Sequence, residues 1–145
     1  YILEVGTGAG VSTGYLASVS SKSKVVTVDA PHPAEKEVRR NLRKIKNIEY
    51  IAADVLETLT DIMESGETPQ FIHVAHTAFW KEAMEIIIRN AGPNTVVVLE
   101  DMGKKQKQEW WKQAIKDERV GVTFQLKKLG IMFFDKKMNK QHYVL

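Results

Sequence analysis

The first fourteen residues constrain this chain most, because they join a strand to a helix through three closely spaced glycines. Residues 1–3 are apolar and predict a short buried strand, which Glu4 interrupts at its end. Glycines follow at positions 6, 8 and 10, and a helical pattern begins near Ser12. Glycine permits positive φ and close approach of a ligand, and the free N–H groups at a helix start favour a polar or anionic group. The segment therefore predicts a ligand site at a strand–turn–helix junction.

The glycine spacing indicates which ligand this turn suits. A dinucleotide-binding turn has the pattern G-x-G-x-x-G, whose third glycine comes three positions after the second. Here that position is Val11, and the third glycine comes early, at Gly10. An acid before the turn also suits a cationic ligand better than a diphosphate, because opposite charges attract. The turn therefore disfavours a pyrophosphate site.

Length and composition limit the classes of protein to which the chain can belong. Its 145 residues, 43% apolar and 27% charged, fit one ordinary globular domain. We expect no membrane span and no signal peptide, because no run of eighteen apolar residues occurs and the chain begins directly in a strand. The absence of cysteine excludes a disulfide scaffold and a thiolate metal site, and fits a cytoplasmic protein. The net charge of +3 is mild, so we expect no nucleic-acid binding.

Five segments with strand character alternate with five helical segments. The expected strands cover residues 1–3, 24–29, 48–53, 70–75 and 95–99, and the expected helices cover residues 11–20, 35–46, 55–65, 78–90 and 104–118. Ser12 or Thr13 is the expected cap of the first helix. Residues 120–126 and 130–134 predict a hairpin, and 141–145 one more edge strand. This order predicts an α/β fold, a Rossmann-like doubly wound and mostly parallel sheet, covered on both faces, with a C-terminal antiparallel β-hairpin.

Both ends of the sequence fall inside apolar strand segments. The chain opens on the first residue of an expected central strand, with no helix or loop before it, and Leu145 ends an apolar run. We therefore expect residues 1–145 to form a single domain that lacks its N-terminal segment.

Polar side chains follow the expected parallel strands at the points where these strands end. They are Glu4 with its glycine turn, Asp29, Asp54, His76 and the pair Glu100-Asp101. In an open α/β sheet, ligands bind at the carboxyl ends of the strands, near the point where the strand order reverses. Because independent segments agree, this clustering is the strongest functional indication in the sequence.

The motif Glu4-Val-Gly-Thr-Gly-Ala-Gly10 resembles the first motif of class I S-adenosylmethionine-dependent methyltransferases. Residues 4–17 and the hairpin at 122–134 are most similar to the small O-methyltransferases of the catechol and caffeoyl-CoA type, and the five βα units match that architecture. The resemblance implies a class I methyltransferase fold with S-adenosylmethionine as cofactor. In that family the acid lies near the methionyl amino end of the ligand and the glycines pass under it. The implied cofactor residues in this turn are Glu4, Gly6, Thr7, Gly8 and Gly10.

Two further acids fit other parts of that cofactor. Asp29, followed by Ala30, comes nineteen residues after Gly10, where a carboxylate can accept hydrogen bonds from ribose hydroxyls; a plain helix cap is the alternative. By resemblance, Asp54 faces the adenine amino group and the backbone of Val55 supports the ring. A helix cap explains Asp54 equally well, and both roles can hold together.

The later strand ends depart from the metal-dependent members of that family. In those proteins the fourth strand ends in an aspartate and the fifth in Asp-Asn, and together they hold a divalent ion. Here the corresponding positions are His76 and Asp101-Met102. Because Mg²⁺ prefers oxygen ligands, we expect no required metal, although His76 with Asp101 could hold a softer ion.

His76 and Asp101 are the candidate catalytic residues, and His76 also borders the cofactor. A neutral imidazole near the transferable methyl could take a proton from an acceptor hydroxyl or amine; a structural cap is the alternative. His73 has the opposite parity along the strand and is expected to point elsewhere. Phe79 and Trp80 could line an acceptor pocket or pack in the core.

The sequence as a whole predicts S-adenosylmethionine-dependent methyl transfer, most readily O-methyl transfer, to a small-molecule acceptor. The expected partners include no nucleic acid and no membrane, and the expected state is a monomer or homodimer. A catalytically silent relative that binds the cofactor or a partner is the first alternative, because the fourth and fifth strand ends are altered. A nucleotide-dependent oxidoreductase is the second, which the position of Gly10 disfavours.

Overall fold

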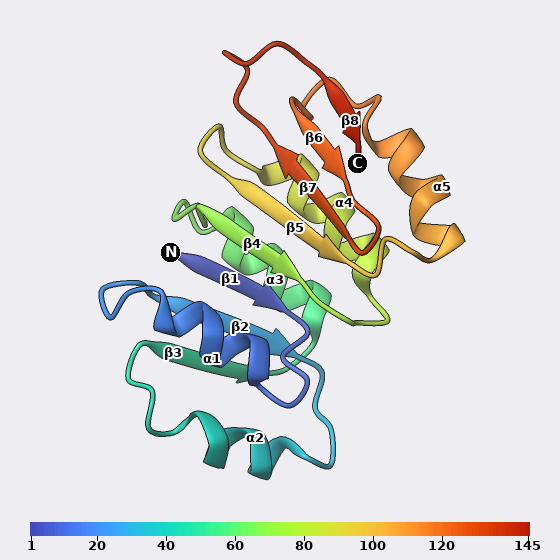
Figure 1. Cartoon of the computed structure of the whole chain (residues 1–145). Helices are drawn as coiled ribbons and strands as arrows, with labels where there is room; N and C mark the ends of the chain where they lie inside the picture. Colours follow the sequence, from blue (N-terminus) through green and yellow to red (C-terminus); the bar gives the residue numbers. More distant parts are fainter.

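An eight-stranded sheet organises the computed structural model, which describes all 145 residues (Figure 1). The strands lie in the order β3-β2-β1-β4-β5-β7-β6-β8. The first five pair in parallel, β7 is antiparallel to both β5 and β6, and β8 pairs in parallel with β6. The predicted α/β fold, with its mostly parallel sheet and C-terminal antiparallel hairpin, is confirmed. The strand order reverses between β1 and β4, which makes that junction the switch point of the sheet.

Every predicted strand and helix is present. The parallel strands are β1 (Ile2–Val5), β2 (Val25–Asp29), β3 (Ile48–Ala52), β4 (Phe71–Val74) and β5 (Val96–Glu100). The remaining strands are β6 (Thr123–Gln125), β7 (Leu129–Phe133) and β8 (His142–Val144). The helices are α1 (Val11–Ser18), α2 (Glu35–Leu42), α3 (Val55–Glu64), α4 (Trp80–Asn90) and α5 (Lys105–Ala114). No helix has the length and apolar character needed to cross a membrane.

The start of α1 differs from the prediction. Glu4 does not interrupt the first strand but lies inside β1, and neither Ser12 nor Thr13 caps the helix. The N-cap is Gly10, which has a φ of 82° and no side-chain hydrogen bond. The hydroxyls of Ser12 and Thr13 instead donate to the Glu4 carboxylate at 2.6 and 2.5 Å. A buried carboxylate is the stronger acceptor, so it takes the two hydroxyls that local sequence would assign to the helix end.

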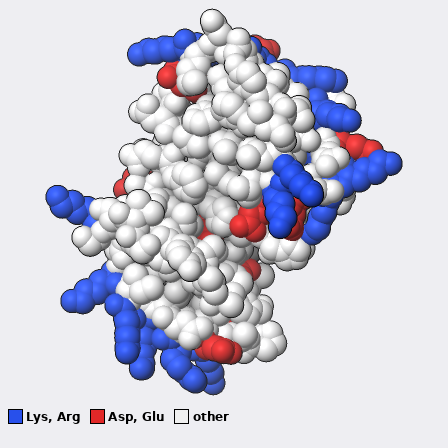
Figure 2. Space-filling view, in the orientation of Figure 1, with Lys and Arg blue, Asp and Glu red and all other residues white.

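Most of the hydrophobic core lies between the sheet and the helices α3, α4 and α5 on one face (Figure 1). Leu3, Leu99 and their neighbours on that face are fully buried. On the other face α1 packs against β2, whereas β5 and β7 alternate between buried and half-buried residues. Figure 1 shows no helix in front of these two strands, so the expectation that helices cover both faces holds only for part of the sheet. Figure 2 shows that charged side chains gather mainly at the periphery of this face.

Trp111 and Gly130 form the tightest contact between α5 and the sheet. Trp111 is 2% exposed whereas Trp110 is half-buried, as expected for adjacent residues on one helix. A Cβ atom at Gly130 would lie 2.6 Å from two atoms of the Trp111 ring. The absence of a side chain at Gly130 is therefore what lets α5 pack this closely on β7.

Replacing Gly130 by alanine should destabilise the protein through overpacking. We expect Gly130→Ala to lower the free energy of unfolding by about 1–3 kcal/mol, measured by urea denaturation. Gly14→Ala is the matched control, because its nearest neighbour would lie 3.8 Å away and the residue is inside α1. Helix propensity predicts that the free energy of unfolding of this control rises by roughly 0.5–1 kcal/mol. Equal stabilities of the two variants would contradict the packing argument.

Candidate functional site

The glycine turn after β1 and the loop after β4 meet at the switch point of the sheet. A Cβ atom at Gly6 would lie 3.3 Å from the Cβ of Thr77 and 3.5 Å from the backbone oxygen of His76. The three glycines of the turn all have positive φ, with values of 96° at Gly6, 53° at Gly8 and 82° at Gly10. Glycine is the residue that adopts such angles without strain. The structure thus brings the glycine turn and the His76 loop into one site.

Gly8 borders open space, whereas Gly10 is closed in. No atom lies within 4 Å of a Cβ placed on Gly8, but Leu42 of α2 would lie 3.1 Å from a Cβ on Gly10. The Gly8 N–H donates to Oδ2 of Asp29 at 2.9 Å, and the Ala30 N–H donates to Oδ1 at 2.9 Å. Each carboxylate oxygen of Asp29 therefore keeps acceptor capacity for a ligand. The turn offers a free approach at Gly8 with a carboxylate beside it.

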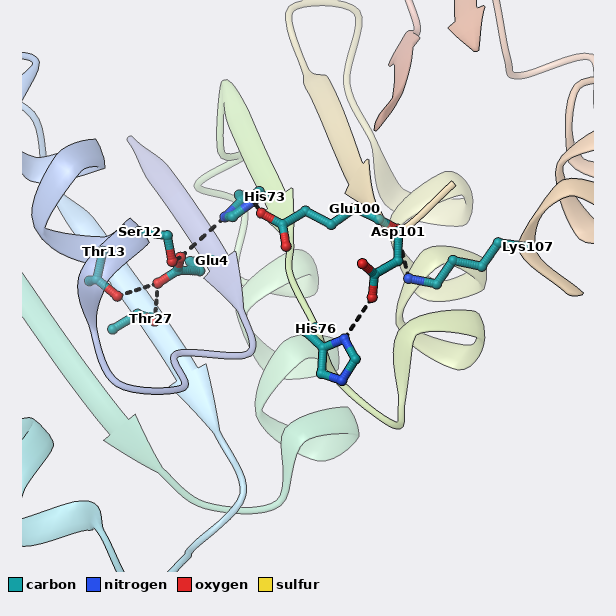
Figure 3. Close-up of polar contacts among 9 residues, drawn as sticks. All are labelled: Glu4, Ser12, Thr13, Thr27, His73, His76, Glu100, Asp101 and Lys107. Atoms are coloured by element: carbon teal, nitrogen blue, oxygen red, sulfur yellow. Dashed lines mark hydrogen bonds and ion pairs between the residues drawn. The ribbon is translucent and has the colours of Figure 1, made fainter. Parts of the chain in front are cut away.

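Beneath this turn, the Glu4 carboxylate is fully buried and collects four donors (Figure 3). Its Oε1 accepts from Ser12 at 2.6 Å and lies 3.1 Å from Nδ1 of His73. Its Oε2 accepts from Thr13 at 2.5 Å and from Thr27 at 2.7 Å. Burial alone would raise the pKa of Glu4, but the hydrogen bonds from His73 and the three hydroxyls hold it below its usual value. Glu4 is therefore a charged and fully satisfied acceptor.

This enclosure gives Glu4 and Thr7 supporting positions at the turn. Thr27 donates its single proton to Glu4, so Thr7, whose oxygen lies 2.7 Å from that of Thr27, must donate to Thr27. The Thr7 side chain is consequently turned inward, and the residue is 3% exposed. The Glu4 carboxylate holds the start of α1 to the sheet. Its position near the amino end of a ligand, which the resemblance implied, stays a prediction.

His73 is a site residue that sequence reasoning missed. His73 lies on β4, opposite Glu4 of β1, and its Nε2 is 2.9 Å from Oε1 of Glu100. Carboxylates face both ring nitrogens, so both must carry protons and the ring is an imidazolium. Burial alone would lower the pKa of His73, but the hydrogen bonds and charges of Glu4 and Glu100 raise it. His73 and His76 face different partners, as their opposite parity along the strand predicted. Residue spacing gives no sign that acids on β1 and β5 converge on His73.

His76 and Asp101 form a more accessible pair at the edge of the site (Figure 3). Nδ1 of His76 lies 2.6 Å from Oδ2 of Asp101, which also accepts from Nζ of Lys104 at 3.1 Å. The hydrogen bond from His76, followed by that from Lys104, lowers the pKa of Asp101 and keeps it charged. The charged acceptor faces Nδ1, and Nε2 has no partner in the protein. The His76 side chain is 78% exposed, so Nε2 is open to a ligand.

The backbone around Asp101 is held in an uncommon conformation. Asp101 has a φ of 61° and is the one non-glycine residue with positive φ. The Glu100 carbonyl before it accepts from Nζ of Lys107 at 2.7 Å, and the Met102 carbonyl after it accepts from Nε2 of Gln108 at 3.0 Å. Contacts on both sides thus fix the conformation that aims Asp101 at His76. Such enforced conformations cluster at functional sites.

Asp54 caps a helix, which was one of its two expected roles. Its Oδ1 accepts from the backbone N–H of Glu57 at 2.8 Å, which makes Asp54 the side-chain cap of α3. The side chain of Val55 is buried in the core at 3% exposure. Contact of Asp54 and Val55 with an adenine ring stays a prediction.

The residues at the fourth and fifth strand ends do not fit a divalent metal ion. No group of three or more His, Cys, Asp or Glu side chains is arranged to hold one. Met102, at one of the positions where the resemblance implied a metal ligand, is fully buried in the core. Both nitrogens of His73 face carboxylates, and Asp101 already accepts from His76 and Lys104.

Several solved structures with this fold are methyltransferases. A Staphylococcus aureus protein, provisionally described as a caffeoyl-CoA O-methyltransferase, matches 92% of this chain and 75% of its own at 19% identity, with a TM-score of 0.77. A Podospora anserina methyltransferase bound to S-adenosylhomocysteine (SAH) aligns with 92% of this chain over 70% of its own length, at 14% identity and a TM-score of 0.76. A Bacillus cereus O-methyltransferase in complex with SAH matches 91% and 73% at 20% identity, with a TM-score of 0.75. No protein-family model and no curated protein matches the chain in sequence. These likenesses establish the class I methyltransferase fold.

The His73 ion pairs should make stability depend on pH in a defined direction. The folded pKa of His73 is raised above its ordinary 6.5, so its contribution is complete below pH 6.5 and is lost as pH rises through the folded pKa. We expect His73→Gln to lower the free energy of unfolding by about 3–5 kcal/mol below pH 6.5, and by less as pH rises through the folded pKa of His73. Denaturant unfolding of both proteins between about pH 5.5 and 9 measures the difference.

His142→Gln is the control for this experiment. Burial and the nearby Lys140 lower the pKa of His142, so its contribution cannot decline as pH rises. A stability difference between wild type and His73→Gln that is constant with pH would show that His73 is not the titrating group.

Proposed function

We propose that this chain is an S-adenosylmethionine-dependent methyltransferase that acts on a hydroxyl group of a small molecule. One observation carries the proposal: the glycine turn, which is open at Gly8 with Asp29 beside it, lies against the loop that carries His76, whose Nε2 has no protein partner. The methyltransferase fold and the SAH bound in solved structures of that fold support it.

The residues around the turn fit the proposed cofactor in space and in charge. Gly8 leaves room for the ligand at the turn, and the carboxylate of Asp29 has acceptor capacity for two ribose hydroxyls. Ala30, Asp54 and Val55 follow the ends of β2 and β3, where an adenine ring would lie in this arrangement. Carboxylates also suit a cationic sulfonium better than a diphosphate.

The chain itself has two tasks in the proposed reaction, to position the acceptor and to remove its proton. The bound cofactor supplies a methyl group activated by a positively charged sulfur. Asp101 orients His76 through Nδ1, so that Nε2 is placed to accept the hydroxyl proton of the acceptor. The cofactor, when bound, would give up its methyl group to the acceptor oxygen and leave as the neutral thioether. Alignment of the two reactants supplies much of the rate enhancement. In this proposal no divalent ion takes part.

Filling the open space at Gly8 should block the cofactor. Asparagine tolerates a left-handed backbone, so Gly8→Asn adds a side chain above the turn with limited strain. We expect it to weaken SAH binding at least tenfold in isothermal titration calorimetry. Gly66→Asn is the matched control, because Gly66 also has positive φ and open space but follows α3, away from the turn. No SAH binding by the wild type at millimolar ligand would refute the cofactor assignment.

Loss of the base should affect turnover far more than cofactor binding. With a labelled methyl donor and a panel of phenols and catechols, we expect His76→Ala to lower kcat about 10²–10⁴-fold, with a much smaller change in SAH affinity. Asp101→Asn should give a smaller loss, because asparagine tolerates the φ of 61° but is uncharged. His142→Ala, a histidine on the edge strand β8, is the control. A wild type that binds SAH but turns over no acceptor would instead be the catalytically silent relative.

A further inference from the structure

A cavity of about 260 Å³ opens beside His76, between the loop after β4 and the start of α5. Its walls include Trp80, Asp101, Lys104 and Lys107. It is therefore next to the proposed catalytic base, and part of its wall comes from the first turn of α5, which the reaction outlined above does not use.

Lys107 is a buried cation with unused hydrogen-bonding capacity at this cavity (Figure 3). The residue is 2% exposed, and its Nζ has a single acceptor, the Glu100 carbonyl oxygen at 2.7 Å. It lies 5.2 Å from the centre of the Trp80 ring and forms no ion pair with a carboxylate. An ammonium group has three N–H donors, so two are left without a protein acceptor. Burial lowers the pKa of Lys107, as expected for a cation without a paired anion.

The start of α5 has the opposite of the usual charge arrangement. Lys104, Lys105 and Lys107 lie in or next to the first turn, which has no acidic residue, although a helix N-terminus favours negative charge. No side chain caps the helix, and the backbone N–H groups of Lys105 and Gln106 have no acceptor in the protein. The one carboxylate lining the cavity, Asp101, already accepts from His76 and Lys104. The cavity therefore presents free donors and excess positive charge.

We propose that this cavity binds an anionic group, a carboxylate or a phosphate, carried by the methyl acceptor. The anion takes the free N–H groups of Lys107 and the backbone amide of Gln106, and the acceptor hydroxyl then faces Nε2 of His76. This inference rests on the proposed function and narrows it to acceptors that carry both a hydroxyl and an acid. A bound anion would offset the positive charge of Lys104 and Lys107 and also accept from the free N–H groups at the helix start. The Glu100 carbonyl, a neutral acceptor, does neither.

The test uses two probes that differ only in charge, 4-hydroxybenzoate and its methyl ester, with inorganic phosphate as a third. Each is titrated into ¹⁵N-labelled wild-type protein at constant ionic strength while the amide resonances of Lys105 and Gln106 are followed. We expect saturable shifts with 4-hydroxybenzoate or phosphate and none with the ester. The tighter of the two anions identifies the acid. Equal responses to acid and ester, or no response to either anion at millimolar concentration, would overturn the proposal.

Variants on the same helix separate a site from general charge. Lys107→Met keeps the length and packing of the side chain and should weaken anion binding at least tenfold. Lys112→Met removes an exposed lysine from the last turn of α5 and should leave anion binding unchanged. Equal weakening by both variants would show non-specific attraction and refute the site. If Lys107→Met fails to fold by circular dichroism, Lys104→Met replaces it with the same expected loss.

SAH titration of the same proteins distinguishes this inference from the proposed function. We expect SAH to bind wild type and Lys107→Met alike. SAH binding without anion binding would refute the anionic acceptor and leave methyl transfer standing. Anion binding without SAH binding would keep the anion site and refute its role as an acceptor subsite.

Discussion

The buried carboxylate of Glu4 is the interaction on which the rest of the site depends. A charge without solvent is tolerated only when its hydrogen bonds are complete, and here the donors come from α1, β2 and β4. Each of these elements must therefore sit at a defined distance from β1. His73 extends the same network to Glu100 on β5, so the chain of charges crosses the sheet at its switch point. The glycine turn above Glu4 is consequently fixed from below, whereas its outer side stays open at Gly8.

Two histidines near the switch point of the sheet lie in contrasting surroundings. His73 is nearly buried and holds β1 and β5 together through two carboxylates, whereas His76 is exposed and has one free nitrogen. Glu100 connects the His73 network to the start of α5, because its side chain contacts His73 and its carbonyl accepts from Lys107. The backbone that follows Glu100 then places Asp101 against His76. A rigid charged network thus supports an accessible pair, which is the arrangement that the proposed removal of a proton from a bound acceptor would use.

Much of the fold could be predicted because hydrophobic periodicity and glycine or proline breaks are local signals. Every helix and strand was located, but α2 and α5 end at Leu42 and Ala114, about a turn earlier than the charged pattern suggested. Helical spacing on a solvated surface continues into turns without any energetic penalty, so periodicity alone marks helix ends poorly. The cap of α1 was mispredicted for a different reason. Ser12 and Thr13 have ordinary capping chemistry, and only the proximity of Glu4 diverts their hydroxyls.

The sequence alone determined the order of the elements, the glycine turn and the polar residues at the ends of the strands, since these depend on residue type and spacing. Tertiary structure decided which of those residues meet. The imidazolium of His73, the conformation of Asp101 and the burial of Lys107 all arise from contacts between residues far apart in the sequence. Protonation and hydrogen bonding depend on the distance between partners and on exclusion of water, and neither is encoded at a single position in the chain.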